Sequence, residues 1–191
     1  MVDSTPLTGE PLAIDLVNTR PNTVDGPVDL LADVTRLRSW LGLQAERFPE
    51  PTPDAAALTD TDLAAVRAVR EHIAAAVQAA RHGEQPPATA LDGLNAALHA
   101  APAIQELVWD GGSVTLTSHR PGAPGTRLAA LFAEDTVCLL TDPAVRTVRT
   151  CEGEDCVMLF LPTHPRRRWC SASRCGNRAR VARYYQRHKA N

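Results

Sequence analysis

Four of the five cysteines in this 191-residue chain form two pairs of identical spacing near the C-terminus. Each pair encloses four residues, and thirteen residues separate Cys151 and Cys156 from Cys170 and Cys175. Two such loops can present four thiolates to one ion, which is the tetrahedral arrangement of a structural zinc site. The spacing therefore predicts that Cys151, Cys156, Cys170 and Cys175 bind Zn²⁺.

Other interpretations of these cysteines stay open. The pairs could have a redox or disulfide role, and His164 between them could replace one ligand. A catalytic zinc ion keeps a position open for water, whereas four cysteine ligands leave none. The pattern favours a structural ion, because residues 144–191 are too few to bury a sufficient apolar core without one.

The sequence around the cysteines predicts a treble-clef-like fold. Residues 157–161 are an apolar strand, 162–165 are a turn with two prolines, and 166–169 are a returning strand. After Cys175 the chain has no helix breaker, so we expect a helix that holds Cys175 in its first turn. Helix N-terminal amides there would stabilise the thiolate.

Residues 1–143 are predicted to form a mainly helical domain with one small β-hairpin, so the whole chain is of the α+β class. The apolar run 12–19 is compatible with strand or helix. The other expected elements are a helix from an Asp29 cap to Gly42, a helix from a Thr59 cap to Gly83, a helix over 88–101, a hairpin of 107–109 with 114–117, and a helix from a Thr126 cap to about Leu140.

The net charge of −2 is a cancellation between the two parts of the chain. Residues 1–143 carry nine basic and 19 acidic side chains, whereas residues 144–191 carry 11 basic and three acidic ones. Such asymmetry indicates that the C-terminal part faces a polyanion, although a solvated basic tail would look the same. We expect DNA as the partner, with RNA or an acidic protein as alternatives.

Arginine supplies almost all of this basic charge, and guanidinium groups suit phosphate contacts. Helical spacing places Arg180, Arg183 and Arg187 in one stripe, with Val181 and the tyrosines on a side that could pack on Trp169. Some arginines could instead brace the zinc site or bind the acidic domain, and for Arg178 this is the expectation. The candidate nucleic-acid-binding residues are Arg166, Arg167, Arg168, Arg174, Arg180, Arg183 and Arg187.

A polar group at the end of the 12–19 run is the best candidate ligand site of the N-terminal domain. Asp15, Asn18, Thr19 and Arg20 could converge on an unknown small molecule. The alternative is that these side chains cap neighbouring backbone groups. No nucleotide-binding loop, nucleophile elbow or paired-histidine motif occurs, so we do not expect an enzyme.

A secretion signal has a basic segment followed by an apolar one, and residues 1–10 contain neither. No run reaches the about 18 apolar residues of a membrane helix. We therefore expect a cytoplasmic protein with no membrane partner, in which cysteines stay reduced.

The segment Trp169-Cys170-x₄-Cys175-Gly176-Asn177-Arg178 closely resembles the CGNR zinc-finger family. Upstream, Leu12-x-x-Asp15-Leu16-Val17-Asn18-Thr19 is similar to the start of the ABATE domain that commonly precedes this finger. The resemblance implies a bacterial, stress-induced transcriptional regulator with a DNA-binding finger and a sensing domain, divided at residues 143 and 144.

Three functional hypotheses follow. The first is a transcription regulator whose zinc module contacts DNA under control of the N-terminal domain. The second is a zinc-stabilised module that binds RNA or protein, and the third is a small-molecule receptor or enzyme in residues 1–143. A single finger covers few base pairs, so a homodimer would improve specificity, but no sequence feature demonstrates one.

Overall fold

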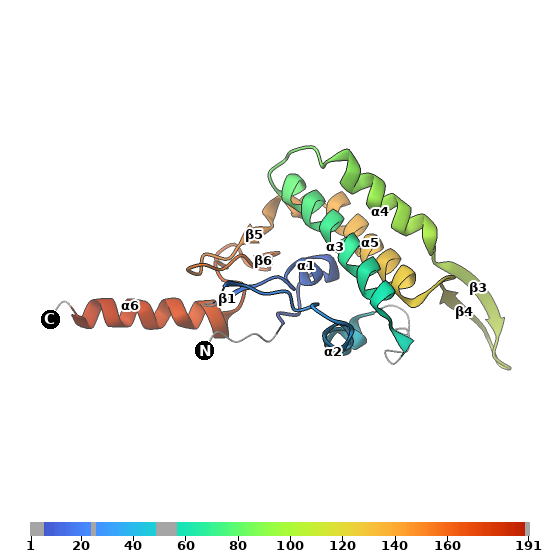
Figure 1. Cartoon of the computed structure of the whole chain (residues 1–191), viewed down its shortest axis with the longest axis horizontal. Coiled ribbons are helices and arrows are strands. Elements are labelled where there is room, and N and C mark those ends of the chain that lie inside the picture. The colour runs from blue at the N-terminus through green and yellow to red at the C-terminus, as the bar shows by residue number, and fades with distance from the viewer. Residues whose placement is uncertain (1–5, 24–25, 49–56, 190–191) are drawn as a thin grey trace.

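The computed structural model describes residues 6–23, 26–48 and 57–189. A helical body lies between two projections, a β-hairpin at one end and a single helix at the other (Figure 1). Among the described residues, no helix combines the length and the hydrophobicity needed to cross a lipid bilayer.

The body contains five α-helices among its described residues. They are α1 (Leu12–Val17), α2 (Val34–Gln44), α3 (Asp60–Arg81), α4 (Ala88–Ala100) and α5 (Pro124–Thr141), with 3₁₀ turns at Ala45–Arg47 and Pro143–Thr147. The antiparallel strand pairs are β1 (Asn22–Thr23) with β2 (Gly26–Pro27), and β3 (Ile104–Trp109) with β4 (Val114–His119). The predicted α+β class is confirmed.

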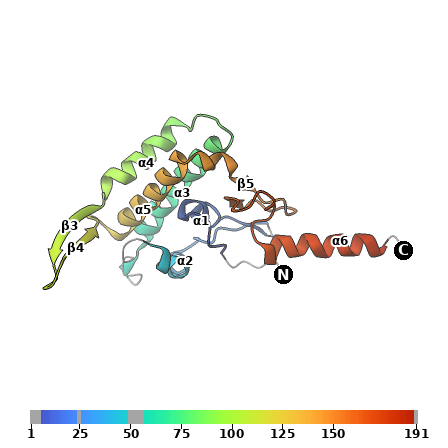
Figure 2. The same ribbon diagram turned by 180° about the vertical axis from the view of Figure 1, so that it is seen from behind.

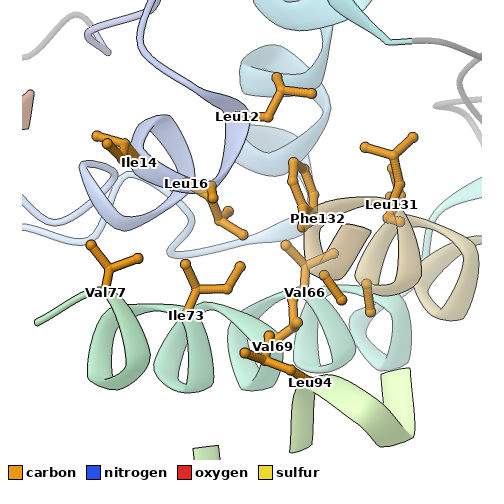
Figure 3. Packing of buried hydrophobic residues seen from close by; sticks show 14 of the residues in the cluster. Leu12, Ile14, Leu16, Val66, Val69, Ile73, Val77, Leu94, Leu131 and Phe132 are labelled. Atoms are coloured by element: carbon orange, nitrogen blue, oxygen red, sulfur yellow. The ribbon is translucent and has the colours of Figure 1, made fainter. Parts of the chain in front are cut away.

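The long helix α3 is the centre of the body, and its start is the one predicted. The Thr59 side chain accepts from the Asp62 amide, and the Asp62 carboxylate accepts from the Thr59 amide, which completes a capping box. Val66, Ile73 and Val77 recur at helical spacing and are fully buried. This face packs against α1, α4 and α5, as Figure 3 shows for α1 and α5.

The ambiguous run at 12–19 is helical because its side chains are buried on more than one side. All residues from Leu12 to Leu16 are buried, including Ala13 and Asp15 at the alternate positions, and Leu16 points toward α3 and Phe132 of α5 (Figure 3). A strand buried on one face would instead alternate buried and exposed positions. Tertiary packing decided between two local structures that the sequence allowed.

Two predicted helix caps were wrong, for reasons that involve distant residues. Helix α2 begins after Asp33, whose carboxylate accepts from the Arg36 amide, and it passes through Gly42. Asp29, the predicted cap, instead pairs with Arg70 of α3. The α2 start therefore lies four residues later than predicted.

Helix α5 begins at Pro124 rather than after Thr126. Proline suits the first helical turn because its fixed φ is helical and no amide there needs a partner. The Gly125 amide donates to the Asp62 carboxylate of α3 at 2.6 Å. A side chain from another helix thus caps α5, which local spacing cannot reveal.

The Asp29–Arg70 pair ties the segment after α1 to α3, and it yields a pH-dependent prediction. Arg70 is 1% exposed and donates to both Asp29 carboxylate oxygens, at 2.7 and 2.6 Å. Burial raises the pKa of Asp29, but hydrogen bonds from Arg70 and from the Leu31 amide, together with the charges of Arg70 and Arg20, more than offset this and lower it from 3.8 to about 2. A carboxyl group with a depressed pKa stabilises the fold above its unfolded pKa and loses that effect as pH falls.

We expect Asp29→Asn to lower the free energy of unfolding by about 2 to 4 kcal/mol at neutral pH, because the buried Arg70 loses its bidentate anion and is left with a 3.8 Å ion pair to the exposed Glu71. The difference from wild type should shrink between about pH 4 and about pH 2, where the wild-type carboxylate takes up its proton. Urea denaturation followed by circular dichroism measures both effects. A difference that stays constant over this range would contradict the assignment.

Candidate metal centre and nucleic-acid interface

The four predicted cysteines meet at one point of the C-terminal part. Their sulfur atoms all lie within 4.8 Å of one another, and no other residue belongs to this group among the described residues. Cys151, Cys170 and Cys175 are buried, and Cys156 is partly buried. Four sulfurs at such distances match the ligand set of a structural zinc ion, and His164 is not part of it.

Hydrogen-bond donors surround the sulfurs. The Cys170 amide donates to Cys151 Sγ at 3.2 Å, and the Gly153 amide approaches the same atom at 3.4 Å. The Arg178 guanidinium donates to Cys175 Sγ at 2.9 Å. Such donors compensate the negative charge that four thiolates place on a zinc site.

The sulfurs perturb one another strongly. A hydrogen bond with Cys156 lowers the pKa of the Cys151 thiol to about 2, and the same contact raises the pKa of Cys156 to about 12. Hydrogen bonds with Cys151 and Cys156 raise the pKa of Cys170. Four thiolates this close together therefore need a cation to compensate their charge.

Glycines allow the close approach of the chain to the sulfurs. A Cβ atom at Gly153 would lie 3.0 Å from Cys175 Sγ, which is too close for an ordinary contact. A Cβ atom at Gly176 would lie 3.1 Å from Trp169 Cδ1. Sequence reasoning did not identify Gly153, although a glycine inside a Cys-x₄-Cys loop is the kind of signal that could have done so.

The predicted hairpin of the zinc module was wrong in its pairing. Strand β5 (Arg149–Thr150) pairs with β6 (Leu159–Phe160), so the hairpin encloses the first cysteine pair. Residues 166–169 form no strand. The Arg167 guanidinium donates to the carbonyls of Leu161, Trp169 and Cys170. These side-chain hydrogen bonds, and not strand pairing, therefore fix the backbone of this segment.

The helix after the last ligand is confirmed in outline. Cys175 lies in a π-helical turn (Ala172–Gly176), and α6 (Asn177–Lys189) follows directly. The prediction placed Cys175 in the first turn of the helix itself. The order of loop, hairpin and helix agrees with a zinc module.

Two family models match the chain on either side of this arrangement. ABATE, described as "Putative stress-induced transcription regulator", matches residues 10–143, and the CGNR zinc finger matches residues 147–188. The chain belongs to the ABATE family. The resemblance is thereby confirmed, and the CGNR finger binds zinc through its four cysteines. No curated protein matches the chain.

The candidate arginines of the CGNR finger fall into two groups. Arg180, Arg183 and Arg187 lie exposed along α6, where they line one open surface with Gln186. Arg166 is also exposed. These side chains are available to a polyanion.

Other candidates are used by the fold or lie near the metal. Arg167 forms an ion pair with Glu10 of the ABATE domain and lies 4.5 Å from the centre of the Phe160 ring, so it is a brace between the two parts. Arg168 pairs with Glu152 at 2.5 Å. Arg174 is half-buried and lines a cavity next to Cys175.

The apolar side of α6 does not pack on Trp169, contrary to expectation. Val181, Tyr184 and Tyr185 are 44%, 52% and 65% exposed, and the Tyr184 ring stacks on His188 within the helix. Figure 2 shows α6 projecting away from the body, as Figure 1 does from the other side. The helix is therefore accessible around its circumference.

The residues proposed to bind a ligand point to different partners. The buried Asp15 carboxylate accepts from the Gly9 and Glu10 amides and pairs with Arg47; burial raises its pKa although these contacts lower it. Thr19 donates to the Leu16 carbonyl, and Arg20 pairs with Glu71. The structure thus gives these three side chains roles within the ABATE domain.

Asn18 joins the ABATE domain to the CGNR finger. Its amide nitrogen donates to the Leu159 carbonyl at 2.9 Å, and its oxygen accepts from the Leu159 amide at 2.8 Å. Asn18 also lines a cavity of about 250 Å³ that reaches Pro21, Leu30 and three zinc cysteines, those at positions 156, 170 and 175. Asp15, Thr19 and Arg20 do not line it. No sequence signal could show this link, because 141 residues separate its ends.

Removing one zinc ligand should release the metal. Cys175→Ser is expected to reduce the zinc content from about one ion per chain to near zero and to unfold the finger, while the ABATE domain stays helical. Elemental analysis and circular dichroism measure the two effects. Cys138→Ser is the control, because Cys138 is an exposed thiol outside the cluster. A Cys175→Ser protein with full zinc content would refute the ligand assignment.

Removing the Asn18 side-chain amide should loosen the finger from the body. Asn18→Leu leaves the buried amide and carbonyl of Leu159 unpaired, so hydrogen exchange of the Leu159 amide should accelerate about tenfold or more. Exchange measured by mass spectrometry tests this. Asn95→Leu, at an exposed position of α4, is the control and should leave Leu159 unchanged.

Proposed function

We propose that this protein is a zinc-containing DNA-binding transcription regulator. In this proposal residues 144–191 bind DNA, and residues 1–143 sense a signal and modulate that binding. The protein acts in the cytoplasm, where its zinc thiolates stay reduced. The proposal includes no enzymatic activity, in keeping with families described as a regulator and a zinc finger.

The observation that carries the proposal is the free basic stripe of α6, defined as Arg180, Arg183 and Arg187. Within the described part of the chain, their hydrogen bonds go to Asn177 and to backbone carbonyls, and none pairs with a carboxylate. Arginines that only braced the acidic domain would be engaged by its carboxylates, as Arg167 is. The stripe is therefore open to phosphates.

The shape of α6 suits a nucleic-acid groove. The helix has 13 residues, projects from the body and is about 20 Å long. The DNA major groove is about 12 Å wide and admits an α-helix. Stripe arginines at the groove would contact phosphates or guanine edges.

Modulation by the ABATE domain has a physical route. Asn18 and Glu10 of the ABATE domain bond to Leu159 and Leu161 around β6, next to the zinc loop. A change in the helical body that moved α1 would move this strand and, with it, the base of α6. This coupling is part of the proposal.

Binding should depend on salt and on the stripe. We expect the affinity for duplex DNA to fall steeply with ionic strength, and Arg183→Ala with Arg187→Ala to reduce the salt slope by about 2. Electrophoretic titration of the zinc-loaded chain at several salt concentrations measures this. Arg36→Ala, an exposed arginine of α2 paired with Asp33, is the control.

Two results would count against this proposal. Binding that is insensitive to salt, or unchanged in the double variant, would remove the stripe as the contact surface. Selection of bound sequences from a genomic pool then separates DNA from the alternatives, since an RNA- or protein-binding module would enrich no duplex motif.

A further inference from the structure

The β3–β4 hairpin has one face made of exposed apolar side chains. Side chains alternate along each strand, and the register pairs Leu107 with Leu116 and Trp109 with Val114. These four side chains therefore share one face, which we name the hairpin apolar face. They are 76%, 61%, 67% and 61% exposed, in the order named.

The opposite face of the hairpin has a different character. It carries Glu106, Thr115 and Thr117, and an ion pair joins His119 to Glu106 at 3.8 Å. Ile104 and Val108 on this side are 41% and 42% exposed, less than the side chains of the hairpin apolar face. The division into a polar and an apolar face is typical of a sheet whose apolar face is covered.

Nothing within the described residues covers the hairpin apolar face. The two strands contact mainly each other, and the hairpin extends beyond the helices in both views (Figures 1 and 2). A two-stranded hairpin alone is only marginally stable in water. A partner that buried this face would therefore supply the packing that the hairpin lacks.

We propose that a second copy of this chain packs on the hairpin apolar face. In a two-fold pair a residue on the axis meets its own copy, so a charged group there would oppose itself. The face carries no charged residue; Gln105 and Ser118 complete it at the base of the strands. It can pack on itself without burying an unpaired charge.

The area also suits a pair of identical chains. Trp109 has about 150 to 250 Å² of side-chain surface to bury, and with the smaller Leu107, Leu116 and Val114 the face exposes on the order of 500 Å² per chain. Two such faces would bury about 1,000 Å², which meets the lower bound for a specific interface.

This inference goes beyond the proposed function and does not rest on it. The hairpin and α6 lie at opposite ends of the molecule (Figure 1). Association through the hairpin therefore leaves the basic stripe accessible. Failure of DNA binding would leave the association unaffected, and the reverse also holds.

Sedimentation equilibrium of the zinc-loaded full chain, from about 1 to about 100 µM, tests the proposal. We expect the mass to rise from 20.6 kDa to twice that value. Leu107→Ser with Leu116→Ser, a directly opposed pair on the apolar face, should weaken association about thirtyfold or more. Val108→Ser with Thr115→Ser, the neighbouring opposed pair on the polar face, is the matched control.

A second variant keeps the test decisive if the first one misfolds. Leu107→Glu changes a single side chain that is 76% exposed, so the monomer should tolerate it, while the pair would place two like charges together. A wild-type chain that stays at 20.6 kDa over the whole range overturns the proposal. So does a dimer that both apolar-face variants leave intact.

Discussion

The C-terminal part of this protein depends on four thiolates that share one zinc ion. In the described residues of the CGNR finger, regular structure amounts to a strand pair of two residues each, a π-helical turn and one projecting helix, with a small apolar cluster around Phe160. That cluster includes three of the cysteines themselves, so the ligands are also the core. Zinc binding therefore supplies the folding free energy that apolar burial cannot provide at this size.

The finger is not an independent body beside the ABATE domain. Leu159 of β6 belongs to the main hydrophobic core, between the helices of residues 12–141. Asn18 holds the same residue by its backbone, and Arg167 pairs with Glu10. The helical body thus contacts the segment from which α6 and its basic stripe project. Such contact between the two parts is a physical requirement for one part to regulate the other.

The acidic and basic side chains are divided between the helical body and the finger. The body carries most of the carboxylates. Arg167 pairs with Glu10 of the body, whereas the partner of Arg168 is Glu152 of the finger itself. Helix α6, which carries the stripe, projects away from the acidic body (Figure 1), and the hydrogen bonds of the three stripe arginines stay within this helix. A projecting helix keeps its basic side chains accessible to a partner. A helix packed on the body would bring these side chains close to the carboxylates of the body.

The sequence by itself determined the α+β class, the helix cap at Thr59, the four zinc ligands and the inner part of the β3–β4 hairpin, which extends in the structure to Ile104–Trp109 and Val114–His119. These follow from local rules, because periodicity, caps and metal-ligand spacing act over a few residues. Only the tertiary structure decided which strand pairs with β5, that Asp62 caps α5, and that Asn18 binds Leu159 instead of a ligand. Those features depend on groups tens to more than a hundred residues apart, and such contacts exist only once the core has brought the elements together.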